Sequence, residues 1–315
     1  MATVTPPVPG RRHRTPLARR EARWAYLFLA PWIIGFLIFY AGPMLASLWL
    51  SFTEYDVINP PTYTGLDNYR ELMRDPAVAR SLGNTVYYTA LHVPLVMLIS
   101  LGLALLLKRV GRLQGFFRTV FYLPVMTPAV AVGILFLLLL NTQDGLINRA
   151  LGLVGIAGPS WTTDPHWVMP GIILMSLWSL GSTVIIYLAA LQNVPRDLYE
   201  AAAIDGAGPW ARFRSVTLPM ISGALFFTLI VNTIASLQMF TEVYTMYFGN
   251  RETQNTFNSD AASFYVIHLF QEAFQFLHMG FASAMAWLLF VIILIITLIQ
   301  VKLSNRFVYY EGEDK

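Results

Sequence analysis

The 315-residue chain has no cysteine, which excludes disulfide bonds, catalytic thiols and thiolate metal ligands. Lysine is scarce: Lys108, Lys302 and Lys315 are the only three, and none follows a glycine-rich phosphate loop. The sequence therefore offers no nucleotide site, and no cofactor is expected in this chain. The five histidines have no metal-ligand spacing, and neither HExxH nor GxSxG occurs, so no metal site and no catalytic set are expected.

Charged residues are also few. They make up 12% of the chain, against about 25% in soluble domains, whereas hydrophobic residues make up 56%. Such a chain cannot cover itself with polar surface, so the lipid bilayer is expected to be its main solvent. The net charge of +3 is small and indicates no nucleic-acid partner.

Long apolar runs are what the chain does have. A membrane-spanning helix needs about 20 mostly apolar residues. Six runs meet this requirement and predict an all-α polytopic membrane protein with six transmembrane helices, at residues 24–50, 84–107, 118–140, 168–192, 219–247 and 281–301.

Prolines inside these runs predict irregular spans. Pro94, Pro124 and Pro128 predict broken or tilted helices, because proline removes an intrahelical hydrogen bond. Pro43 is expected to bend the first span near its outer end. Pro170 is expected near the start of the fourth span, where a missing amide costs little.

Arginine and lysine are unevenly divided between the two sides of these spans. With the N-terminus in the cytoplasm, sixteen of the 21 fall on the cytoplasmic side and five outside, namely Arg70, Arg74, Arg80, Arg149 and Arg251. The positive-inside rule then predicts that both termini are cytoplasmic. Residues 1–23 are expected to form a disordered basic tail, residues 24–307 the membrane domain, and residues 308–315 a C-terminal tail.

The most informative stretch is the alanine-rich segment EAAAIDGAGPWARFRSVTLP, residues 200–219, between the fourth and fifth runs. Asp197 is expected to cap a short helix that continues to Ala203. Gly206 is expected to supply a turn, and Pro209 to begin a second short helix. The alanines are small enough to let a partner backbone come close. Residues 193–219 are therefore predicted to form a cytoplasmic helical elbow on which another protein docks.

Polar side chains interrupt the fifth run: Asn232, Thr233, Ser236, Gln238 and Glu242. Asn232, Ser236 and Met239 recur at helical spacing on one face. Two interpretations stay open for them, hydrogen bonds between helices or a pocket for a polar solute. Glu242 lies near the outer end of the span, where hydration alone accounts for it.

The elbow has the spacing Glu-Ala-Ala, three residues, Gly, nine residues, an aliphatic residue, one residue, Leu-Pro. This pattern resembles the EAA signature of permease subunits of ATP-binding-cassette (ABC) importers. Residues 25–307 resemble the carbohydrate-uptake, MalF-like branch of that family. The similar stretches are residues 27–56, 64–89, 116–133, 190–208 (ALQNVPRDLYEAAAIDGAG) and 272–290 (EAFQFLHMGFASAMAWLLF).

The resemblance implies the transmembrane domain of a type I importer, and half of a translocation path for a di- or oligosaccharide. It implies as partners a second homologous permease, two ABC ATPase subunits that use ATP and Mg, and an extracytoplasmic solute-binding protein. The expected location is the cytoplasmic (inner) membrane of a bacterium or archaeon.

The resemblance also implies the site residues. ATPase coupling falls on Glu200, Ala201, Ala202, Asp205, Gly206 and Ala207. Substrate binding falls on Asn232, Ser236, Met239, Met175, Ser179 and Ser182. An aromatic such as Trp178 or Phe240 is expected to stack on a sugar ring.

Some features depart from the family. The loop after the fifth span reads FGNRETQNTF (residues 248–257), and Met239 stands where the maltose system has a polar contact, so the particular sugar stays open. One alternative is an importer of glycerol-3-phosphate or a related phosphodiester, although no arginine or lysine lies between Pro219 and Phe248 to bind a phosphate. The other alternative is a six-span sensor that transports nothing.

Overall fold

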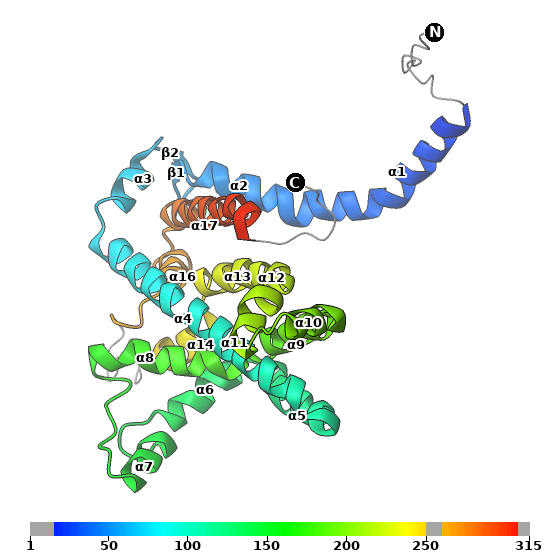
Figure 1. The fold of residues 1–315 in the computed structure, drawn as a ribbon. Coiled ribbons are helices and arrows are strands. Elements are labelled where there is room, and N and C mark those ends of the chain that lie inside the picture. The colour runs from blue at the N-terminus through cyan, green and yellow to red at the C-terminus, as the bar shows by residue number, and fades with distance from the viewer. Residues whose placement is uncertain (1–15, 250–259, 308–315) are drawn as a thin grey trace.

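The computed structural model describes residues 16–249 and 260–307, and the chain there is almost wholly helical, as predicted. Four helical stretches are long and apolar enough to cross a membrane, and two bent helix pairs bring the number to six if each pair is one span. Figure 1 shows the helices grouped in a bundle that α4 (Pro76–Arg109) crosses diagonally. Three predicted segments lie wholly or partly outside the described residues. They are the first fifteen residues of the N-terminal tail, the C-terminal tail (residues 308–315) and most of the loop after the fifth span (residues 248–257).

The first span consists of α1 (Pro16–Phe36), a π-turn (Leu37–Ala41) and α2 (Gly42–Leu50). Pro43 lies in the first turn of α2, directly after the irregular π-turn. Because α1 begins at Pro16, the prediction that residues 16–23 are disordered is wrong. They are mostly good helix formers, and they follow a proline that suits a first turn. The apolar part of this span has no residue buried against the rest of the chain, and α1 projects away from the bundle in Figure 1.

Two short strands, β1 (Thr53–Glu54) and β2 (Thr62–Tyr63), pair antiparallel before α3 (Asp67–Leu72) and the second span. The Asp75 carboxylate accepts a hydrogen bond from the backbone of Ala77 at 2.7 Å and caps α4. This helix continues through Pro94, so the predicted break does not occur there, and of the two predicted outcomes only the tilt agrees with its diagonal course in Figure 1. Helices α9 and α13 pack against α4, and such cover lets a membrane helix keep a proline.

The third span breaks where its prolines predict. A 3₁₀ turn (Gly111–Leu113), α5 (Gln114–Tyr122) and a second 3₁₀ turn (Leu123–Met126) end just before Pro128, and α6 (Ala129–Leu139) leaves at 96°.

The fourth span is broken as well, although no proline lies at its break. α8 (Pro165–Ser176) and a 3₁₀ turn (Leu177–Ser179) meet α9 (Gly181–Asn193) at 51°. Pro170 lies near the start of this span, as predicted, but it is the sixth residue of α8 and not in the first turn, where a missing amide would cost little. The helix begins earlier, at Pro165, because the Asp164 carboxylate caps it by accepting from the backbone of His166.

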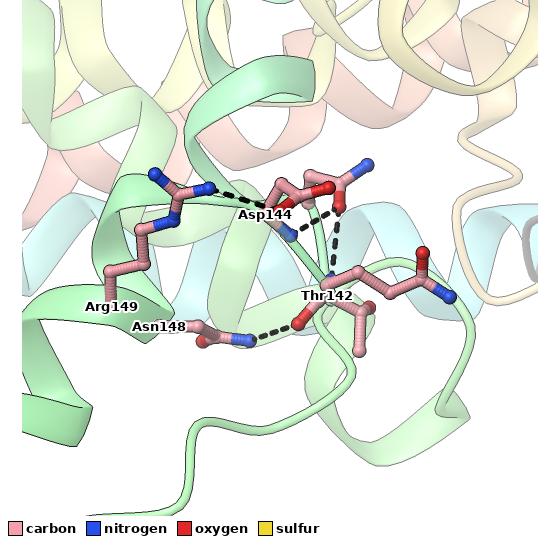
Figure 2. A network of polar contacts seen from close by, with 6 residues as sticks. Thr142, Asp144, Asn148 and Arg149 are labelled. Carbon is pink, nitrogen blue, oxygen red and sulfur yellow. Dashed lines mark hydrogen bonds and ion pairs between the residues drawn. The ribbon is translucent and has the colours of Figure 1, made fainter.

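Helix α7 (Leu146–Leu153) connects the third and fourth spans and is held by a polar network (Figure 2). The amide of Asn148 donates to the carbonyl of Thr142 at 3.1 Å and accepts from the indole of Trp161 at 2.7 Å. Arg149 pairs with Asp144 at 3.0 Å. These contacts tie α7 to the end of α6 and to the segment before α8.

The elbow and the fifth span follow. Helices α10 (Arg196–Ile204) and α11 (Pro209–Arg212) form the elbow, and a π-turn (Phe213–Thr217) and α12 (Leu218–Met220) lead into α13 (Ser222–Leu237). After a kink at Phe240, α14 (Thr241–Val243) and a π-turn (Tyr244–Phe248) complete the span. Helix α16 (Tyr265–Phe270) and a π-turn (Gln271–Gln275) precede the sixth span, α17 (Met279–Phe307).

Three groups of buried side chains hold the bundle together. The first fills the space between α6, α8 and the segment from α14 to Phe248. The second joins the end of α4 to α9 and to the root of the elbow. The third packs the start of α4 against α16 and α17.

The breaks of the third and fourth spans lie against each other, and this contact requires a glycine. A Cβ on Gly181 would collide with the carbonyl oxygen of Phe121. We expect Gly181→Ala to destabilise the domain by about 1–3 kcal/mol, since backbone must move to make room. Gly102→Ala, inside α4 with open space around its Cβ, is the control. Thermal denaturation of the purified protein measures both, and equal midpoints would contradict the packing described here.

Candidate functional site

Two broken spans, the third and the fourth, meet the fifth span around one cavity, at the point where the fifth span is interrupted between α13 and α14. Its wall is made by α6, by the junction of α8 and α9, and by α13 and α14, while the unbroken α4 closes the remaining side. The cavity has a volume of about 200 Å³. Irregular backbone is tolerated at membrane depth only where protein buries it or a water-filled cavity meets it. The breaks therefore mark this cavity as the polar centre of the domain.

All six residues predicted to bind substrate line this cavity: Asn232, Ser236, Met239, Met175, Ser179 and Ser182. The first three come from α13 and the residues after it, and the others from the α8–α9 junction. The structure thus brings together two segments that are far apart in the sequence, on either side of the elbow.

Both interpretations of the polar fifth span apply, to different residues. Thr233 faces α17, where its hydroxyl accepts from Gln300 at 3.0 Å, so it makes an interhelical hydrogen bond. Asn232 and Ser236 face the cavity instead. The amide nitrogen of Asn232 is buried and has no hydrogen-bond partner. A stranded donor of this kind is costly unless a ligand or water pairs with it.

Sequence reasoning missed the contribution of α4. His92 lines the cavity, and its Nδ1 lies 2.9 Å from Oγ of Ser236, while its Nε2 is buried without a partner. Its ring stacks on Tyr88, with centroids 4.9 Å apart, and the Tyr88 hydroxyl donates to Ser176 at 2.6 Å. The available signal was an ionisable residue within an apolar run, which by default indicates a functional site.

The lining has one negative side chain and, among the described residues, no positive one. Glu242 is half-buried and lines the cavity, so it contributes to the site and is not merely a hydrated group at the end of the span. This arrangement suits hydrogen bonding to a neutral solute better than binding to an anion.

The two aromatics expected to stack on a sugar are not among the residues that line the cavity. Phe240 packs against Tyr244 and Phe270, with centroids 5.0 and 5.1 Å apart. Trp178 meets Phe136 edge-on at 6.0 Å. These ring contacts hold both side chains away from the cavity. The aromatic residue in the cavity wall is instead Tyr88.

A larger groove of about 570 Å³ runs between α12, α13 and α17. Its lining is mostly aliphatic, with Arg214 and Gln300 among its few polar residues. Such a surface suits lipid chains or a neighbouring helix more than a polar solute, so volume alone does not identify the site.

The second candidate feature is the elbow, and its turn is built as predicted. Gly206 has a φ of +77°, the left-handed conformation that favours glycine. The amide of Ala207 donates to the carbonyl of Ala202 at 2.9 Å, and that of Gly206 to Ala203 at 3.1 Å. This pair of bonds is a Schellman motif, which ends α10 sharply. Pro209 begins α11, also as predicted.

One detail of the elbow differs from prediction. Pro195, not Asp197, is the N-cap of α10, and no side chain supplies a capping hydrogen bond. Asp197 lies within the first turn, where its negative charge is still favourable next to the helix N-terminus. The helix starts earlier because Pro195 already has a fixed backbone angle suited to a helix boundary.

The predicted coupling residues are concentrated on an open surface. Glu200, Ala201, Asp205 and Gly206 are exposed, whereas Ala202 and Ala207 are partly covered. Beside them Ile204 is 87% and Trp210 71% exposed. Large apolar side chains so exposed next to small ones indicate a protein contact surface.

Comparison with known proteins agrees with this geometry. The family model described as "binding-protein-dependent transport system inner membrane component" matches residues 97–309, which include the elbow and most of the cavity wall. The chain belongs to this family. It is therefore a permease subunit of a binding-protein-dependent ABC importer with the type I importer fold, and such permeases are not enzymes themselves.

Individual relatives cover nearly the whole chain. The probable ABC transporter permease YesP of Bacillus subtilis is 39% identical over 300 residues, 94% of this chain and 95% of that protein. The lactose transport permease LacF of Rhizobium radiobacter is 35% identical, covering 87% and 92%. The sn-glycerol-3-phosphate transport permease UgpA of Pectobacterium atrosepticum is 32% identical, covering 93% and 97%.

Among solved structures, the chain is similar to one in a bacterial alginate ABC transporter bound to an alginate pentasaccharide-loaded periplasmic protein. The TM-score is 0.81, with 25% identity, and the match covers 93% of this chain and 98% of that one.

Proposed function

We propose that this permease imports a neutral di- or oligosaccharide, with the cavity as its half of the solute site. The observation that carries the proposal is the convergence of Asn232, Ser236 and the α8–α9 serines on one cavity, at the breaks of the third and fourth spans and the interruption of the fifth at Phe240. Hydroxyl groups of a sugar can both donate and accept, which matches the unpartnered nitrogens of His92 and Asn232.

The cavity is smaller than an ordinary small-molecule site, which has about 300–1,000 Å³. In this chain alone it has room for one part of a larger solute. A second homologous permease would supply the opposite wall, as the first span's uncovered surface also allows.

The relatives named for lactose and for alginate support a sugar, and the relative named for sn-glycerol-3-phosphate supports an anionic solute instead. The charge of the cavity lining favours a sugar over an anionic solute. Glu242 would repel a phosphate, and no arginine or lysine is among the residues that line the cavity in the described part of the chain.

The elbow is proposed to dock on one of two ABC ATPase subunits in the cytoplasm, with both chain termini on that side and the solute-binding protein outside. ATP-driven closure of the ATPases would move the elbow as a rigid unit and switch the cavity between outward and inward access. The setting is the cytoplasmic membrane of a bacterium or archaeon.

The proposed orientation predicts which positions a membrane-impermeant thiol reagent can reach. The natural chain has no cysteine, so single replacements give unambiguous signals. Cysteine at Met73, which is 83% exposed in the first outer loop, should be labelled in intact cells. Cysteine at Asp205 in the elbow should be labelled only after the cells are lysed. Labelling of Asp205→Cys from outside would overturn the orientation.

The docking proposal predicts different effects for two neighbouring glycines. Gly206→Ala should cost about 1–2 kcal/mol locally, because a Cβ disfavours the left-handed turn. It should therefore reduce the amount of ATPase that co-purifies with the permease and reduce uptake, while membrane insertion is retained. Gly208→Ala is the control, since Gly208 has a φ of −69° and open space around its Cβ. Equal ATPase recovery from the two variants would count against the elbow as the docking site.

The solute site predicts a loss of uptake with intact assembly. Asn232→Ala should reduce sugar uptake about two- to tenfold, as expected for a lost hydrogen bond to a neutral group. Ser236→Trp should fill the cavity and block uptake. Val231→Ala, which changes the exposed face of the same helix, is the control. Uptake by proteoliposomes containing the whole transporter is the measurement, and unaltered rates in both cavity variants would place the solute elsewhere.

A further inference from the structure

At the end of α4, the side chain of Lys108 makes a polar contact with both α9 and the elbow. Its ammonium group donates a hydrogen bond to the carbonyl oxygen of Leu191 at 2.9 Å. Leu191 lies in the last turn of α9, where carbonyls lack partners within the helix and attract cations. The same ammonium lies 5.0 Å from the ring centroid of Tyr199 in α10. One cation thus contacts the last turn of the fourth span and the first helix of the elbow.

The contact continues to the return segment of the elbow. The hydroxyl of Tyr199 lies 3.0 Å from that of Thr217, which is 4% exposed and ends the π-turn before α12. Tyr199, which lies in α10, therefore contacts the return segment of the elbow through Thr217 and α4 through Lys108. Buried aliphatic side chains of Leu107, Leu191 and Val194 pack around the root of this linkage and limit its freedom to move.

The other end of the linkage is the solute cavity. Lys108 and His92 lie on the same helix, sixteen residues and thus about 24 Å apart. The helix is continuous between them, whereas the third and fourth spans are broken near the cavity and the fifth is interrupted there between α13 and α14. A displacement applied at Lys108 therefore reaches His92 and Tyr88 without being absorbed by a break.

We propose that Lys108 is the positioning residue that transmits movement of the elbow along α4 to the cavity wall. This inference rests on the proposed docking of the elbow on an ATPase. It adds that coupling runs through the second span as well as through the two spans that the elbow joins directly. The contact of Gln192 with Gln114, at 3.1 Å, lies at the same corner but carries no charge.

The test is a coupling measurement on the complete transporter, with its second permease, ATPases and binding protein, in proteoliposomes. Lactose, arabinotriose and maltotriose are offered as labelled probes, and sugar taken up per ATP hydrolysed is recorded. Lys108→Met keeps the length of the side chain but loses the charge. We expect it to lower this ratio at least about fivefold, a typical size for coupling between two sites, while ATP hydrolysis continues.

Two further variants separate positioning from stability. Lys108→Arg can still donate to Leu191 and lie over Tyr199, so it should restore the ratio. Arg109→Met, at the neighbouring exposed position, should leave the ratio unchanged. A residue that merely caps α9 would lower the thermal midpoint of Lys108→Met and leave the ratio at the wild-type value. That result would overturn the proposal.

A distance measurement covers the case in which Lys108→Met does not assemble. Tyr199→Leu removes the ring beneath the ammonium and should give the same loss of coupling. Spin labels attached in place of Arg109 and Asp205 should give one narrow distance distribution when Tyr199 is present, both with and without ADP and vanadate. In Tyr199→Leu the distribution of the same distance should be broad. A narrow distribution and an unchanged ratio in Tyr199→Leu would refute the linkage. If the wild-type transporter imports none of the three sugars yet the distance distributions differ between wild type and Tyr199→Leu as described, the sugar proposal fails and the linkage stands.

Discussion

The structure depends on one constraint: in lipid, each backbone polar group must find its partner within protein or in a water-filled cavity. Unbroken helices meet this constraint by themselves, as α4 and α17 do. Broken helices meet it only where something else supplies the partners. The third and fourth spans are broken and the fifth is interrupted between α13 and α14, and these irregular stretches gather around the same small cavity. The constraint therefore confines irregular backbone, and with it polar side chains, to the place where a solute can use them.

The constraint also divides the spans by task. The broken spans supply the serines, Asn232 and Glu242, whose positions depend on local backbone geometry. The continuous α4 supplies a straight wall with His92 and Tyr88, and it reaches the elbow at Lys108. A site that opens alternately to the two sides of the membrane needs both broken and continuous spans. The flexible junctions of the broken spans open and close the site, while the rigid helix carries the displacement.

Much of the fold follows from the sequence, and the exceptions have physical reasons. The six runs gave the spans, because the hydrocarbon thickness fixes how many apolar residues are needed. Pro124 and Pro128 indicated the third-span break, whereas at Pro94, where a break or a tilt was predicted, the helix is unbroken, since cover by neighbouring helices is not written in the local sequence. The fourth-span break has no proline at all. It depends on the contact of Gly181 with Phe121, two residues sixty positions apart, and only tertiary structure shows that contact.

The candidate site was predictable to the extent that it is periodic. Asn232, Ser236 and Met239 share one helical face, so their convergence could be expected, and the elbow's Gly206 could be assigned to a left-handed turn from its type and place. His92 was not selected, because a lone histidine in an apolar run has no partner that the sequence reveals. Its partner Ser236 lies on another span. Phe240 and Trp178, the aromatics expected to stack on a sugar, pack with other rings, and the ring at the cavity is Tyr88. Residues that act across spans are thus the ones that sequence periodicity leaves out. At this cavity the two that it left out, His92 and Tyr88, both lie on α4, which packs against α9 before the elbow and α13 after it.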